Sequence, residues 1–119
     1  MNQHPRPKKL VRNTMKIIIN ADDFGMSLNV NDAILDLLAR EKISSSTILA
    51  NGPFVEQACA QIHRFPQCSF GVHLNVTEFR PVSQTPALDR LLDSRGEFIM
   101  NRVREIPIDR RLADGIFEE

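Results

Sequence analysis

The sequence predicts an α/β protein with a parallel sheet, and two observations support this fold class. Strand-like and helix-like segments alternate between residues 15 and 75, which is the pattern of βαβ units with right-handed crossovers. The first strand-like segment contains three consecutive isoleucines at residues 17–19. An apolar run without alternation is typical of a strand that is covered on both faces, as in a parallel sheet.

The order of the expected elements follows from hydrophobic periodicity and turn residues. A first strand covers residues 15–20, and a loop follows at residues 21–26. Ser27 or Asn29 caps a helix that runs to about Arg40, because its apolar residues recur every three or four positions. The elements expected after this helix are a strand at residues 46–50, a helix at residues 53–63 and a strand at residues 69–75.

The pattern becomes less regular after residue 75. Residues 77–86 are rich in turn-forming residues, and a turn is expected at residues 94–96. A helix is expected over residues 108–119, where Gly115 lowers the helical propensity. The side chains expected on one side of this helix are Leu112, Ile116 and Phe117.

Length and composition fit one ordinary globular domain. The chain has 119 residues, and its formal net charge of zero gives no overall field that would attract nucleic acid or a membrane surface, so we expect neither as a partner. We expect residues 1–14 to be a basic, disordered leader and residues 15–119 to form the domain. The absence of a signal-peptide or membrane-spanning segment predicts a cytoplasmic protein, in which Cys59 and Cys68 are small buried hydrophobic residues rather than a disulfide.

Four polar residues stand where strands of the expected sheet end. Asp22 and Asp23 follow the first strand, and His73 and Asn75 end the third. Because the carboxyl ends of parallel strands meet at one edge of a sheet, these side chains are expected to lie close together. Gly25 provides the backbone freedom that both aspartates need to face one cleft.

This residue set suits a metal and proton-transfer site. One carboxylate binds a divalent cation together with the imidazole of His73, and the other takes a proton from water. Carboxylate and imidazole ligands suit Zn²⁺, Mn²⁺ or Mg²⁺. An acidic pair before a helix also suits the helix N-terminus, and a single histidine near a strand end also suits a structural role, so both interpretations stay open at this point.

Three sequence blocks resemble the YdjC-like (ChbG-type) carbohydrate deacetylase family. They are NADDFGMS at residues 20–27, SSSTILANGPFVEQA at residues 44–58 and FGVHLNVTE at residues 70–78. The resemblance implies a partial (β/α) barrel, with about three parallel strands, crossover helices and a less regular C-terminal segment. It also implies a metal-dependent hydrolase that removes N-acetyl groups from amino sugars or chitooligosaccharides.

Residue roles carry over by position from this resemblance. Asp22 corresponds to the general base, Asp23 and His73 correspond to metal ligands for Mg²⁺ or Zn²⁺, and we assign Asn75 to substrate binding. The implied partner is an N-acetylated amino sugar or oligosaccharide.

The chain also departs from the family pattern. Family members are about twice as long, since a complete (β/α) barrel needs about 250 residues, and they supply a further histidine ligand from a later strand, whereas no histidine follows His73 here. We therefore expect a fragment of a longer enzyme that binds metal weakly and turns over slowly or not at all. Its open sheet edges favour a homo-oligomer. The alternative is a non-catalytic α/β fragment or self-associating interaction module that retains a vestigial metal site.

Overall fold

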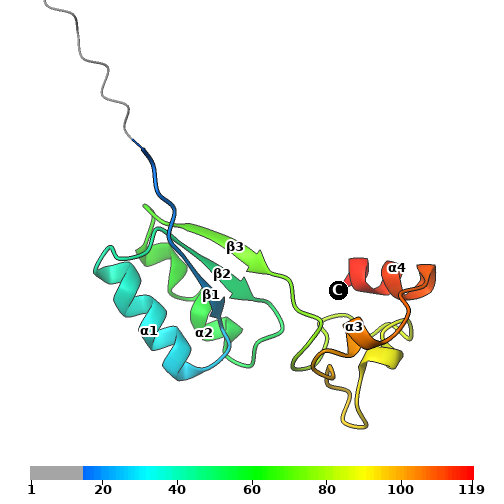
Figure 1. Cartoon of the computed structure of the whole chain (residues 1–119). Coiled ribbons are helices and arrows are strands. Elements are labelled where there is room, and N and C mark those ends of the chain that lie inside the picture. Colours follow the sequence, from blue (N-terminus) through cyan, green and yellow to red (C-terminus); the bar gives the residue numbers. More distant parts are fainter. Residues whose placement is uncertain (1–14) are drawn as a thin grey trace, which may run out of the picture.

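A computed structural model describes residues 15–119, and the expected leader at residues 1–14 lies outside the described residues. Three parallel strands form one open sheet in the order β1-β2-β3 (Figure 1). The strands are β1 (Asn20–Phe24), β2 (Ser45–Leu49) and β3 (Ser69–His73). The predicted α/β class with about three parallel strands is therefore confirmed.

Two crossover connections cover one face of the sheet. The first contains α1 (Leu28–Ala39), whose N-cap Ser27 accepts a hydrogen bond from the backbone N–H of Val30 at 3.2 Å. The second contains α2 (Val55–Cys59) and the short 3₁₀ helix η1 (Ile62–Arg64), so the single helix expected over residues 53–63 is shorter and divided. The buried residues of the core between helices and sheet are Phe24, Ile34, Leu38, Ile43, Ala58 and Phe65.

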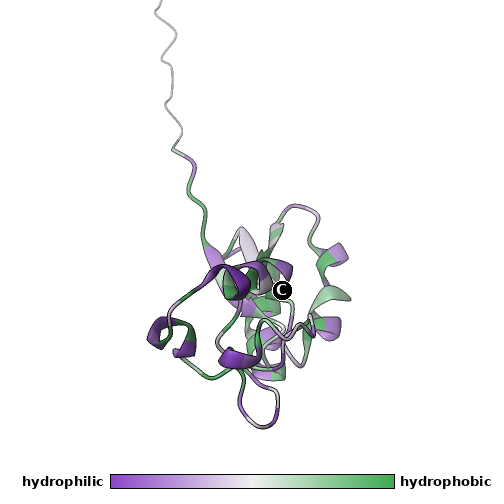
Figure 2. Ribbon diagram, turned by 90° about the vertical axis from the view of Figure 1, so that its right-hand side faces the viewer, coloured by the Kyte–Doolittle hydropathy of each residue, from purple (hydrophilic) through white to green (hydrophobic). Residues whose placement is uncertain are grey.

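The first strand begins later than predicted. Residues 15–19 form no strand, and the side chains of the three isoleucines at 17–19 are 52–80% exposed. The neighbouring strand β2 begins only at Ser45. Within residues 15–19, the backbone hydrogen bonds to this strand and to the residue before it are therefore limited to Ile19, whose carbonyl oxygen accepts the N–H groups of Ser44 and Ser45. Figure 2 shows the segment next to the grey trace, which includes these hydrophobic residues, extending away from the folded part of the chain, so the expectation of a strand covered on both faces was wrong here.

The C-terminal segment builds a second, smaller core. It contains η2 (Asp89–Leu91), α3 (Arg102–Glu105) and α4 (Arg110–Glu118). Its buried members are Leu88, Leu91, Phe98 and Leu112. The helix predicted at residues 108–119 is confirmed, but Phe117 is 91% exposed, so its predicted position on one side with Leu112 and Ile116 was wrong. Phe117 follows the partly buried Ile116 directly and thus points to another side of the helix.

The predicted turn at residues 94–96 is confirmed. Gly96 has a φ of 76°, and Asp93 accepts the backbone N–H groups of both Arg95 and Glu97. These backbone hydrogen bonds, from Glu97 and then Arg95, lower the pKa of the Asp93 carboxyl. The turn is thereby fixed by one side chain.

Both cysteines are free thiols. Cys68 is partly buried against the first core, but Cys59 is exposed at the end of α2, so its expected burial was wrong. Residues 15–119 contain no helix with the length and hydropathy needed to cross a bilayer.

Gly115 generates a stability prediction, because α4 packs closely on the loop before η2 at this point. A Cβ atom on residue 115 would lie 2.6 Å from the Cβ of Ala87. We expect Gly115→Ala to lower the free energy of unfolding by about 1 kcal/mol, since overpacking of about 1–3 kcal/mol exceeds the helical propensity gained by alanine. Urea unfolding measures this change.

The double variant G115A/A87G is the matched test of that contact. Removal of the opposing methyl group should restore most of the lost stability, which would appear as a positive coupling between the two positions. A Gly115→Ala variant as stable as the parent would contradict the packing described here.

Candidate metal and catalytic site

An extra residue in β1 determines where the two aspartates lie. Ala21 pairs with Ser46 and Phe24 pairs with Ile48, so three steps along β1 match two along β2. This is a β-bulge, and Asp23 occupies it with a φ of 69° in the left-handed region. The predicted loop at residues 21–26 is therefore largely a bulged strand, and the departure from regular geometry is at Asp23 itself as well as at Gly25.

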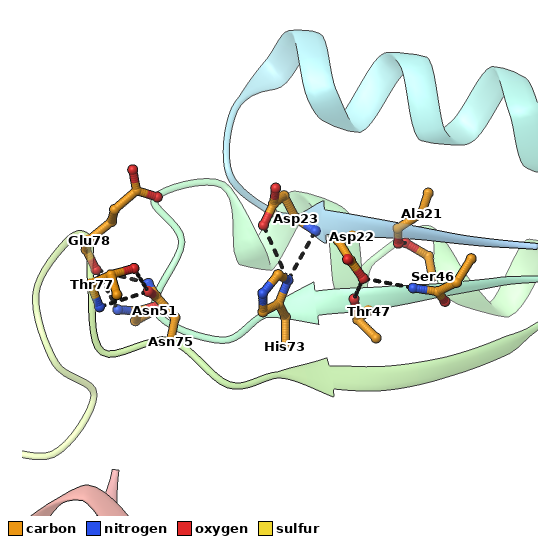
Figure 3. Close-up of polar contacts among 12 residues, drawn as sticks. Ala21, Asp22, Asp23, Ser46, Thr47, Asn51, His73, Asn75, Thr77 and Glu78 are labelled. Atoms are coloured by element: carbon orange, nitrogen blue, oxygen red, sulfur yellow. Dashed lines mark hydrogen bonds and ion pairs between the residues drawn. The ribbon is translucent and has the colours of Figure 1, made fainter. Parts of the chain in front are cut away.

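The bulge separates apolar from acidic side chains. Ala21 and Phe24 both belong to the core under the helices, although they are three positions apart in the sequence. Asp22 and Asp23 both point away from that core, toward β2 and β3 respectively (Figure 3). Two adjacent carboxylates thus share one side of the strand, which regular alternation would forbid.

The structure brings Asp23 and His73 together across the sheet. His73 is the last residue of β3, and Nδ1 of its ring lies 3.2 Å from Oδ1 of Asp23 and 3.3 Å from the backbone nitrogen of Asp23. The two side chains are 32% and 44% exposed respectively. The juxtaposition expected from the carboxyl ends of parallel strands is present, and its two members come from the two outer strands of the sheet.

The surroundings of Nδ1 suit a cation. If Nδ1 carries no proton, it can accept the hydrogen bond from the Asp23 N–H, but its lone pair then also lies beside the negative carboxylate of Asp23. If Nδ1 carries a proton, it can donate to that carboxylate, but two N–H groups then lie against each other. A metal ion bound by the lone pairs of both Nδ1 and Oδ1 would place these two atoms side by side, and the Asp23 N–H would then no longer donate to Nδ1. Two ligands on an ion at about 2.1 Å lie roughly 3.0–3.4 Å apart, and the observed 3.2 Å falls in that range.

Asp22 is oriented by two donors at one oxygen. Its Oδ1 accepts from Nδ2 of Asn20 at 2.7 Å and from Oγ1 of Thr47 at 2.6 Å. No described residue donates to its Oδ2, which leaves that oxygen available for a proton. Sequence reasoning missed Thr47. The feature that could have identified it is its pairing with Gly71 in the neighbouring strand, which places it on the sheet face that also carries His73.

Asn75 organises the loop that follows β3. Its Nδ2 donates to Oδ1 of Asn51 and to the carbonyl oxygen of Glu78, both at 2.9 Å. Its Oδ1 accepts from the backbone N–H and the hydroxyl of Thr77, at 3.0 and 2.9 Å (Figure 3). Asn51 in turn donates to the carbonyl oxygens of Glu78 and Arg80. The contact of Asn75 with substrate stays a prediction.

A pocket opens beside His73 between the sheet and the C-terminal segment. Its polar lining includes His73, Asn51 and Asn75, together with Glu119, whose carboxylate is held by the backbone N–H groups of Val82 and Ser83. The apolar lining residues are Ala50, Val72, Leu74, Val76, Val82 and Ile116. An organic group of mixed polarity therefore has room next to the candidate metal position.

The ligand set is incomplete within the described chain. No group of three or more His, Cys, Asp or Glu side chains surrounds a single point in residues 15–119. Asp23 and His73 would supply two ligands to a metal ion, whereas catalytic zinc usually has three from protein.

Fold and site together define part of a (β/α)-barrel-type protein with an acid–imidazole pair at the carboxyl end of its parallel sheet. The model of the YdjC-like protein family matches residues 16–115, and the chain belongs to this family.

The similar curated proteins bear the name carbohydrate deacetylase. One from Halalkalibacterium halodurans is 37% identical over 84 residues, which cover 71% of this chain and 35% of that protein. One from Listeria monocytogenes serotype 4a is 40% identical over 87 residues, which cover 73% and 35% of the two chains. The chain thus spans about a third of the length of these relatives.

A solved structure shares the fold. It is a protein of Enterococcus faecalis V583 described as a candidate cellobiose-phosphate cleavage protein, with a TM-score of 0.69 and 27% sequence identity. The match covers 86% of this chain and 39% of that one, which agrees with the partial barrel expected from the sequence.

The contacts of Asn75 generate a second prediction. Asn75→Ala should loosen the loop at residues 75–80 and lower the free energy of unfolding by about 1 kcal/mol, because partly buried backbone partners lose their hydrogen bonds. Asn75→Asp keeps an oxygen that accepts from Thr77 but loses the hydrogen bonds that Nδ2 donates to Asn51 and Glu78. Amide hydrogen exchange should therefore accelerate at Thr77 in the alanine variant and much less in the aspartate variant; equal protection in both would contradict this account.

Proposed function

We propose that the chain forms the first part of a metal-dependent carbohydrate deacetylase that hydrolyses the N-acetyl group of an amino sugar or chitooligosaccharide. The observation that carries the proposal is the pairing of Asp23 Oδ1 and His73 Nδ1 at 3.2 Å, beside an oriented Asp22. Relatives named carbohydrate deacetylase that match over residues of this same region support it.

Asp23 and His73 would hold the cation, which is Zn²⁺ or Mg²⁺ by the chemistry of the two ligands. A divalent ion here supplies Lewis acidity to the acetyl carbonyl and makes water easier to deprotonate. Its positive charge would also offset the repulsion between the neighbouring carboxylates of Asp22 and Asp23.

Asp22 acts as the general base in this proposal. Its Oδ2 takes the proton of the attacking water while Thr47 and Asn20 keep Oδ1 fixed. The water oxygen forms a bond to the acetyl carbon, the C–N bond breaks, and the proton passes to the amine that leaves. Acetate and a free amino sugar are the products, and the pocket beside His73 accommodates the sugar.

A second candidate function is a non-catalytic, self-associating module. The observation that favours it is the exposure of apolar side chains on and beside the outer strands, where Val72 is 66%, Leu74 87% and Ile18 80% exposed. In that case Asp23 and His73 would be a vestigial site. A metal affinity that does not change when Asp23 or His73 is substituted would favour this alternative.

The metal site is tested by calorimetric titration with Zn²⁺ and Mg²⁺. Asp23→Ala and His73→Ala should each weaken binding at least roughly tenfold, because each removes one of the two ligands. Asp36→Ala removes an exposed carboxylate on α1 and serves as the control, with unchanged affinity expected. Parent-like binding by both site variants would refute a shared metal site.

The division of roles between the two aspartates gives a separate prediction. Asp22→Asn should leave metal affinity within about threefold of the parent, since Asp22 is not a ligand, and should abolish any measurable release of acetate from a chitooligosaccharide. Calorimetry and an acetate assay measure the two effects on the same preparation. A loss of metal binding as large as that of Asp23→Ala would instead make Asp22 a ligand.

A further inference from the structure

The apolar face of α1 carries a buried asparagine. Asn31 is 0% exposed and lies on the same side of the helix as Ile34 and Leu38, which belong to the first core. A buried amide is costly unless its polar atoms are paired. A polar side chain retained at a core position therefore needs a role that an apolar residue could not fill.

All the partners of Asn31 lie in the segments that follow β1 and β2. Its Oδ1 accepts the backbone N–H of Gly25 at 2.7 Å. Its Nδ2 donates to the carbonyl oxygen of Phe54 at 3.2 Å and to Oε1 of Gln57 on α2. One side chain thus joins α1, the turn after the bulge and the start of α2.

Gly25 is held from both sides by these contacts. Its N–H is bound by Asn31, and its carbonyl oxygen accepts the N–H of Phe54 at 2.9 Å. The backbone of Gly52 packs so closely that a Cβ atom there would lie 2.4 Å from the Gly25 oxygen. The turn has little room to shift while the hydrogen bond to Asn31 is present.

The position of this turn matters for Asp23. The carbonyl oxygen of Asp23 accepts the N–H of Met26 at 3.0 Å, so Gly25 lies inside the turn that Asp23 opens. Asp23 itself has a φ of 69°, and a non-glycine residue stays in that region only when neighbouring structure holds it there. The Gly25–Asn31 bond is a buried contact that supplies this restraint.

We propose that Asn31 is a positioning residue for the metal site. By binding the N–H of Gly25, it keeps Asp23 in the bulge with its carboxylate facing His73. The Asn31 side chain forms hydrogen bonds to Gly25, Phe54 and Gln57 and none to Asp23 or His73, so it acts through the turn and not on the ion. This inference rests on the proposed function, since it assumes that Asp23 and His73 share a cation.

The test is the affinity for Zn²⁺, measured by calorimetry on the whole chain below its unfolding temperature. Asn31→Leu keeps the branched shape and the number of side-chain heavy atoms and removes the acceptor for Gly25, and we expect it to weaken binding about tenfold or more, the size typical of groups that orient metal ligands. Gln57→Leu removes another bond of the same network but leaves Gly25–Asn31 intact, so its affinity should stay within about twofold. Ile34→Ala destabilises the same helix without touching the turn, and it should also bind normally.

Amide hydrogen exchange provides a readout that needs no metal. The Gly25 amide should be strongly protected in the parent, Gln57→Leu and Ile34→Ala chains and should exchange faster in Asn31→Leu. If Asn31→Leu does not fold, Asn31→Asp keeps an acceptor for Gly25 and should retain both the protection and the Zn²⁺ affinity. A tenfold loss of affinity in the aspartate variant with protection intact would overturn the inference.

The outcomes separate the two proposals. If the parent binds Zn²⁺ through Asp23 and His73 and Asn31→Leu binds equally well, the positioning role is wrong and the metal site stands. If affinity falls equally in Ile34→Ala, the effect is general stability and the positioning role is again wrong. If the parent shows no binding that depends on Asp23 and His73, the proposed function fails, and the inference fails with it.

Discussion

The single extra residue in β1 is the constraint on which the rest of the site depends. The core requires Phe24, which is fully buried and packs against Phe70 with ring centroids 6.4 Å apart. It also requires Ala21 on the same side of the strand. A regular strand would place residues 21 and 24 on opposite sides, and the bulge at Asp23 reconciles them. The same irregularity gives the aspartates a common side, so core packing and the polar site are two consequences of one backbone feature.

The central strand β2 stabilises this irregularity from both faces. On the helix side, the fully buried Ser46 donates to the carbonyl oxygen of Ala21 at 2.7 Å, which satisfies a backbone group beside the bulge. On the open side, Thr47 donates to Asp22. Two consecutive hydroxyl residues thus bind β1 above and below the sheet. This explains why the middle strand of a small sheet carries polar residues where a buried parallel strand is usually apolar.

Sequence reasoning predicted the features that depend on local pattern or on general sheet geometry. Helix α1, its cap at Ser27 and the proximity of Asp23 to His73 all follow from periodicity and from the meeting of strand ends in a parallel sheet. The late start of β1 could not be predicted, because hydropathy shows that residues 17–19 suit burial but not whether a partner strand reaches them. Asn31 was overlooked for the converse reason: a polar residue in a helix suggests solvent, and its partners at residues 25 and 54 are remote in sequence.

The positions of the two candidate metal ligands also determine which side of a bound ion would stay open. Asp23 and His73 come from the outer strands of the sheet, and the face between them carries Thr47 and Gly71, neither of which fills the space above it with a large side chain. A cation held there would be open toward the pocket beside His73, where substrate and water can reach it. Two protein ligands on one side and free access on the other leave room for further ligands from outside the described residues. Under the proposed function, an ion held by these two residues would keep the coordination positions that hydrolysis needs.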